Sequence, residues 1–91
     1  MSVRDWLDRL AETQELDLLT ADGYDAAIVG VAQRFNETFV VYDRAIVLRL
    51  LTEEGMTGEE AEEYFDFNIV GSWVGPSTPA YLTRPEPDDG H

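Results

Sequence analysis

Several residue types are missing or scarce in this chain of 91 residues, and each absence narrows what it can do. It has no cysteine, which excludes disulfides, thiolate zinc sites and a cysteine nucleophile. Its only histidine is His91, the last residue, so a histidine triad or histidine metal site cannot be assembled. We therefore expect a protein that is not an enzyme and that needs no cofactor.

Long hydrophobic runs are absent too. No apolar stretch approaches the ~20 residues that cross a bilayer, and the first ten residues mix arginines with aspartates instead of forming a signal peptide. These features predict a cytoplasmic protein that does not enter the membrane.

Positive charge is also scarce. The six basic residues are all arginines, they are scattered, and they face nineteen acids, which leaves a net charge of −13. Such a surface repels phosphate, so we expect no direct contact with nucleic acid or with anionic membranes. The same composition could also reflect a high-GC genome or a salt-adapted cytoplasm, without any function behind it.

What remains is a composition typical of a small globular protein, with 44% hydrophobic and 11% aromatic residues. A chain of this length buries roughly 60% of its unfolded surface, which is enough for one modest core. We expect a single domain over residues 1–83. Residues 84–91 alternate proline with acids and are predicted to form a disordered acidic tail.

Periodicity and capping residues predict the secondary structure. Ser2 is a candidate cap for a helix ending near Thr13, and Trp6 on its apolar stripe is expected to pack in the core against the sheet. Further along the chain, the predicted elements are strands 26–35 and 38–42 joined by a turn at Asn36-Glu37, a helix from Asp43 to Gly55, a second helix from Thr57, and a strand over 78–83. Gly30 within the first strand predicts a bulge, or a place where an aromatic ring crosses the backbone.

These elements predict an α+β fold in the order α-β-β-α-α-β. We expect a short antiparallel sheet with the helices packed on one face, in which Pro79 places the last strand at an edge or at its first residue.

The stretch from Thr57 to Tyr81 combines an acidic helix with an aromatic segment. Thr57 and Glu60 have the spacing of a capping box, which gives this helix a defined start. Beyond Asp66 the charge vanishes and the sequence is largely apolar, and Phe65, Phe67 and Trp73 are expected to pack on the sheet. Asn68 is expected to be a buried amide that ties the helix end to the loop at 75–78.

The helix carboxylates raise one further possibility. Glu60, Glu63 and Asp66 recur at helical spacing and could offer oxygen ligands to Mg²⁺ or Ca²⁺ in a small metal-dependent enzyme subunit. Helix carboxylates without loop carbonyls rarely enclose a cation, which argues against such a site.

One long motif resembles a known family. Its residues are Gly55, Met56, Glu59, Glu60, Ala61, Glu63, Tyr64, Phe65, Phe67, Asn68, Gly71, Trp73, Gly75, Thr78 and Pro79. Together with Val41-Tyr42-Asp43, Asp22-Gly23 and Gly30-Val31, this motif resembles a family of small accessory proteins encoded by tailed phages and prophages. The resemblance covers about residues 22–82 and implies a phage origin, with no activity to carry over.

Three functional hypotheses follow. The first is a phage-type accessory protein that binds a host or phage protein, for example to inhibit a host defence system, and that could also pair with its own copy. The second is a nucleic-acid mimic whose acids block a basic DNA- or RNA-binding cleft. The third, least favoured, is the metal-dependent subunit. The residues predicted to contact a partner are Glu59, Glu60, Glu63, Asp66, Tyr64 and Trp73.

Overall fold

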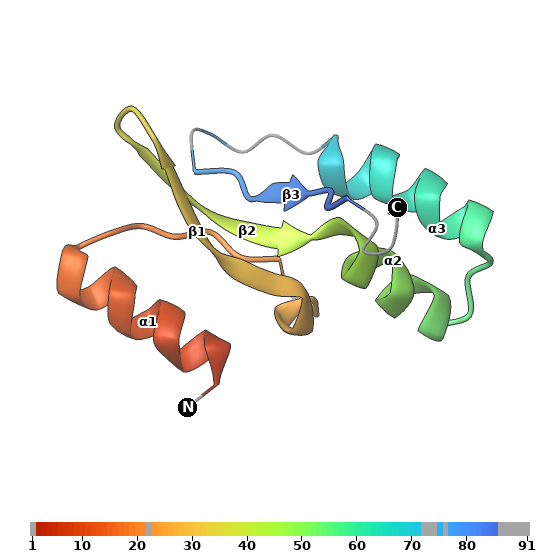
Figure 1. The fold of residues 1–91 in the computed structure, drawn as a ribbon, viewed down its shortest axis with the longest axis horizontal. Coiled ribbons are helices and arrows are strands. Elements are labelled where there is room, and N and C mark those ends of the chain that lie inside the picture. Colours follow the sequence, from red (N-terminus) through yellow and green to blue (C-terminus); the bar gives the residue numbers. More distant parts are fainter. Residues whose placement is uncertain (1, 22, 72–74, 76, 86–91) are drawn as a thin grey trace.

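The computed structural model describes residues 2–21, 23–71, 75 and 77–85 and confirms an α+β fold in the predicted order. Figure 1 shows the helices and strands along the chain. Their bounds are α1 (Val3–Gln14), β1 (Ile28–Arg34), β2 (Glu37–Asp43), α2 (Arg44–Glu53), α3 (Gly58–Tyr64) and β3 (Ala80–Leu82). A 3₁₀ turn (Asp25–Ala27) precedes β1, and a π-helix (Phe65–Val70) continues α3.

The sheet has the strand order β1-β2-β3. β1 and β2 form the predicted antiparallel hairpin, but β3 runs parallel to β2, so the sheet is mixed and not antiparallel throughout. The parallel direction follows from the connection between the two strands. α2, α3 and the π-helix lie between β2 and β3 and form the kind of long crossover that parallel neighbours require. β3 lies at a sheet edge, and Pro79 precedes it.

The hairpin carries two irregularities. The pairing register shifts between Ile28 and Gly30, which confirms the predicted bulge. A Cβ at Gly30 would meet no atom of the described residues within 4 Å, so none of their rings crosses there. The turn lies at Phe35 and Asn36, one residue earlier than predicted, and is flanked by an Arg34–Glu37 ion pair of 3.0 Å. Phe35 adopts a left-handed φ of 56° and is 95% exposed.

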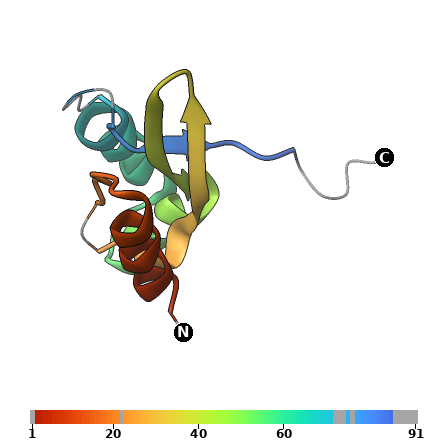
Figure 2. The ribbon, with the colours of Figure 1, turned by 90° about the vertical axis from the view of Figure 1, so that its left-hand side faces the viewer.

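The helices lie on one side of the hairpin, as Figure 2 shows. Side chains from the helices and from β2 form one hydrophobic core, whose fully buried members are Leu7, Ala27, Val40, Tyr42, Val47, Leu51, Ala61 and Phe65. The Tyr42 hydroxyl also accepts a hydrogen bond of 2.7 Å from the Ala21 N–H. The buried ring therefore anchors the segment between α1 and β1.

Side-chain caps begin α1, α2 and α3. Ser2 accepts from the Asp5 N–H, and Asp43 accepts from the Ile46 N–H at 3.2 Å, as predicted. The second oxygen of Asp43 pairs with Arg84 Nε at 2.8 Å. This pairing joins the residue at the start of α2 to the chain that leaves β3.

Trp6 was predicted to lie in the core, but its side chain is 40% exposed, so this prediction was wrong. The neighbouring Leu7 enters the core instead, and Trp6 lies over a shallow hollow beside Val31 of the sheet. Adjacent helical positions point about 100° apart, so only one of this pair can face inward fully.

The aromatic segment after α3 is only partly buried. Phe65 is buried at 2% exposure as predicted, but Phe67 is 79% exposed and Asn68 is exposed, so the predicted burial of these two residues was wrong. Residues two apart on a helix do not share a face, so Phe65 and Phe67 cannot both pack on the sheet. Trp73 lies outside the described residues.

Candidate functional site

The most distinctive surface surrounds α3 and the π-helix. Thr57 accepts from the Glu60 N–H at 3.1 Å, and the Glu60 carboxylate accepts from the Thr57 N–H at 2.9 Å, which confirms the capping box. Negative side chains in this first turn also stabilise the helix through its dipole. Glu60 therefore has a structural role that the other acids of α3 do not share.

The remaining acids of this helix face solvent. Glu59 and Glu63 lie four positions apart, and Asp66 and Phe67 follow by three and four positions, so these four residues share the outer side of the helix. The opposite side carries the buried Ala61 and Phe65. We call the exposed carboxylates of Glu59, Glu62, Glu63 and Asp66 the acidic ridge.

Apolar side chains lie directly beside the acidic ridge. Phe67 is 79%, Val70 is 50% and Tyr64 is 39% exposed. Phe67 and Tyr64 line a shallow hollow of about 530 Å³ together with Met56, Asn68 and three glutamates, Glu54, Glu60 and Glu63. This surface thus pairs large apolar groups with carboxylates.

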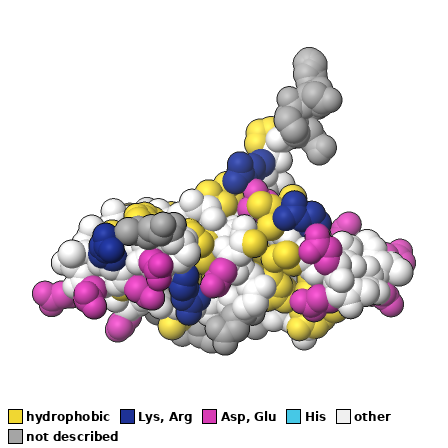
Figure 3. Space-filling view, turned by 90° about the horizontal axis from the view of Figure 1, so that it is seen from below, with side chains coloured by type: hydrophobic (Ala, Val, Ile, Leu, Met, Phe, Trp, Pro, Cys, Tyr) yellow, Lys and Arg dark blue, Asp and Glu magenta, His cyan; other side chains and the backbone are white. Residues whose placement is uncertain are grey.

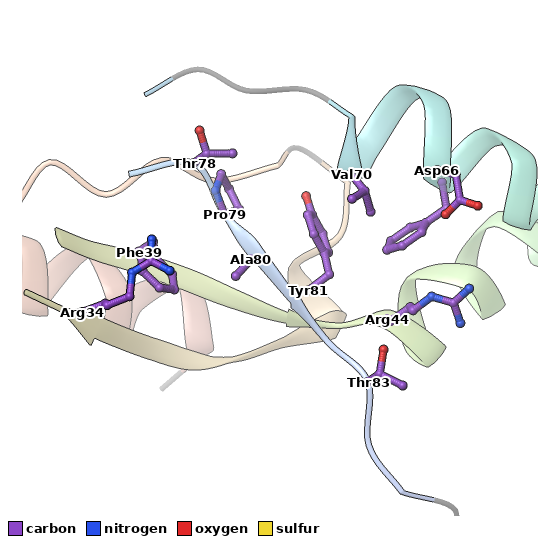
Figure 4. A pocket seen from close by; sticks show the side chains of 11 residues that line it. Arg34, Phe39, Arg44, Asp66, Val70, Thr78, Pro79, Ala80, Tyr81 and Thr83 are labelled. Atoms are coloured by element: carbon purple, nitrogen blue, oxygen red, sulfur yellow. The ribbon is translucent and has the colours of Figure 1, made fainter. Parts of the chain in front are cut away.

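A second depression, the β3 groove, runs beside the edge strand and has a volume of about 490 Å³ (Figure 4). In the figure Arg34 and Phe39 lie together on the hairpin, while Tyr81 points toward the π-helix. The Arg44 guanidinium lies 5.3 Å from the ring centroid of Phe65, a cation–π contact. Asp66 lines this groove and is not among the residues that line the hollow, although it shares the outer side of the helix with Glu59 and Glu63.

A third depression, the tyrosine pocket, shares Thr78, Pro79 and Tyr81 with the β3 groove and has a volume of about 580 Å³. Tyr24, Tyr64 and Tyr81 line it. Burial raises the pKa of Tyr24 above 10.0, and the nearby Tyr64 and Glu54 raise it further. Burial likewise raises the pKa of Tyr81, with added contributions from Tyr42 and Tyr24. Tyr24 and Tyr81 therefore stay protonated and neutral at physiological pH.

The structure brings only part of the predicted site together. Glu60, Glu63 and Tyr64 meet at one hollow, Glu59 is exposed on the same helix, and Asp66 lines the β3 groove instead. Trp73 lies outside the described residues. Sequence reasoning missed Phe39, Arg44 and Tyr81, because their convergence depends on the parallel pairing of β3, for which the sequence carries no local signal.

The acids do not gather only on α3. On the face seen in Figure 3, acidic side chains lie toward both ends of the molecule, with a band of hydrophobic side chains between them. Within residues 2–21, 23–71, 75 and 77–85, no group of three or more His, Cys, Asp or Glu side chains is arranged to hold a metal ion. None of the helices in the described part of the chain combines the length and apolar character that a membrane crossing requires.

Comparison with family models, with curated proteins and with solved structures finds no match to this chain. The similarity to phage accessory proteins therefore stays an expectation of the sequence.

Proposed function

We propose that this chain is a small protein-binding protein that uses the outer side of α3 and the π-helix to contact a basic region of another protein. The single observation that carries the proposal is the position of Phe67, which is 79% exposed on the same helix side as Glu59 and Glu63. A large apolar side chain kept in solvent has no role in folding. Placed among carboxylates, it has the mixed character of an interface in which an apolar centre is surrounded by charge.

The π-helix supports this assignment. Such wide turns are rare and occur often at functional sites. Here the π-helix Phe65–Val70 keeps Phe65 in the core while Phe67 and Val70 face outward. The phage resemblance adds the expectation that the partner is a host or phage protein, including a component of host defence.

Attraction between the acidic ridge and a basic partner should accelerate association and should be screened by salt. The Debye length falls from ~10 Å at 0.1 M to ~3 Å at 1 M ionic strength. Phe67, in contrast, would act through desolvation and would mainly slow dissociation. The two parts of the surface can therefore be separated kinetically.

The test uses the immobilised chain, a bacterial lysate and mass spectrometry, followed by kinetics with the partner found. One variant, Glu59→Gln/Glu63→Gln/Asp66→Asn, removes three charges from the acidic ridge. A matched control, Asp8→Asn/Glu12→Gln/Asp17→Asn, removes three exposed charges from α1 and the residues after it. The ridge variant should lose the partner, and the control should keep it.

A third variant, Phe67→Ser, tests the apolar component. It should fold normally, because the side chain is 79% exposed, and it should weaken partner binding. Binding that depends on salt and on the ridge but not on Phe67 would instead favour the nucleic-acid mimic, in which the carboxylates act alone. If the ridge variant and Phe67→Ser both capture the partner as well as the control variant does, the proposed surface is overturned.

A further inference from the structure

All four tyrosines of the chain gather at one place, although they come from separate parts of the sequence. Tyr24 precedes the 3₁₀ turn, Tyr64 ends α3 and Tyr81 lies in β3, and these three line the tyrosine pocket. Tyr42 of β2 stacks against Tyr81, with ring centroids 5.7 Å apart and an interplanar angle of 28°. The fold therefore builds one aromatic site from four elements.

The position of Tyr81 is fixed before any ligand arrives. Phe65 meets the Tyr81 ring edge-on, with centroids 5.2 Å apart and an angle of 84°. Tyr42 and Phe65 are both buried core residues, at 0% and 2% exposure. A ring held on two sides by the core loses little conformational entropy when a ligand packs against it.

The charges around the tyrosine pocket favour a cation. Its described lining residues include no charged side chain. The neighbouring hollow shares Tyr64 and Asn68 with it and is lined by Glu54, Glu60 and Glu63, with no arginine among its described lining residues. Neutral aromatic rings beside carboxylates attract a positive group through both the ring quadrupole and the negative charge. An anion would be repelled by the same surface.

The protein already uses this kind of contact elsewhere, since the Arg44 guanidinium lies over the Phe65 ring. A volume of about 580 Å³ leaves room for a long side chain and its backbone. We infer that the tyrosine pocket receives an arginine or lysine side chain of the partner, with Glu54 and Glu63 attracting its charge. This inference rests on the proposed protein-binding function and names the group that the partner presents.

The test needs no partner. N-acetyl-arginine N-methylamide is titrated into the full chain, with the citrulline derivative as a neutral probe of nearly the same shape, and the tyrosine ring signals are followed by NMR. The arginine probe should bind with a Kd on the order of 1 mM, roughly 2- to 30-fold more tightly than the citrulline probe. The shifts should be confined to Tyr24, Tyr64 and Tyr81.

Two variants make the test specific. Tyr64 is 39% exposed, so Tyr64→Leu should fold and should lower the affinity for the arginine probe to that for the citrulline probe. The matched control, Phe35→Leu, removes an exposed ring that does not line the pocket and should change nothing. Equal binding of the two probes would overturn the inference, and so would arginine binding that survives Tyr64→Leu, because that would be attraction to the acidic surface in general.

The probe titration and the capture experiment test the pocket and the proposed function separately. If the probes show no preference while the ridge variant still loses the partner, only the tyrosine pocket assignment is overturned. If the arginine probe binds at the tyrosines as expected, the pocket stands even when capture does not depend on the ridge.

Discussion

Replacing Phe35 with glycine should stabilise the protein, although the change removes the largest side chain of the hairpin turn. Phe35 has a φ of 56°, in the left-handed region, where a Cβ crowds the following carbonyl oxygen. Its side chain is 95% exposed and so contributes no packing that glycine would forfeit. The left-handed backbone at Phe35 therefore lowers the stability of the fold, and the exposed ring makes no packing contribution that offsets this loss.

The size of the effect follows from two opposing contributions. A non-glycine residue in the left-handed region costs about 1–2 kcal/mol. Glycine has more freedom in the unfolded chain, which works against it by about 0.5–1 kcal/mol. The net gain should be about 0.5–1 kcal/mol, which raises the Tm of a domain of this size by about 2–8 °C.

Urea unfolding and thermal melting of three proteins would check this. Phe35→Gly should be more stable than the wild type, whereas Phe35→Ala keeps the Cβ and should stay within about 0.5 kcal/mol of it. The difference between the two variants isolates the Cβ from the ring. A Phe35→Gly protein that is less stable than Phe35→Ala would refute the reasoning and would mean that the turn is not strained.

Three further predictions concern the core, a helix start and the tyrosines. Tyr42→Phe removes the acceptor of the Ala21 N–H and should cost about 1–3 kcal/mol in urea unfolding; a smaller loss would show that this amide finds another acceptor. Thr57→Ala should cost about 1 kcal/mol because it removes the cap of α3, and circular dichroism melting that matches the wild type would contradict this. The raised pKa values of Tyr24 and Tyr81 favour the protonated phenols in the folded state, so their contribution to stability is complete below pH 10.0 and is lost as the pH rises through the folded values. Denaturant midpoints measured from pH 8 to 11 should therefore fall less steeply in Tyr24→Phe/Tyr81→Phe, and identical slopes would contradict the assignment.

Local signals in the sequence were sufficient for the order of the elements and for the caps. Ser2, Asp43 and Thr57 begin their helices because a cap depends only on a side-chain oxygen and an amide three residues later. The bulge at Gly30 and the acidic character of the outer side of α3 are local in the same sense. Such features need no knowledge of what lies across the core.

Long-range packing decided the rest. Whether β3 runs parallel or antiparallel depends on how α2, α3 and the π-helix return the chain to the sheet, and whether Trp6 or Leu7 enters the core depends on how α1 lies against that sheet. The tyrosine pocket is the clearest case, because Tyr24 and Tyr81 are far apart in sequence and meet only after β3 has docked beside β2. The sequence alone determined which elements form and that the surface is acidic. Only the tertiary structure decided which side chains meet, because such contacts depend on distances through space and not on spacing along the chain.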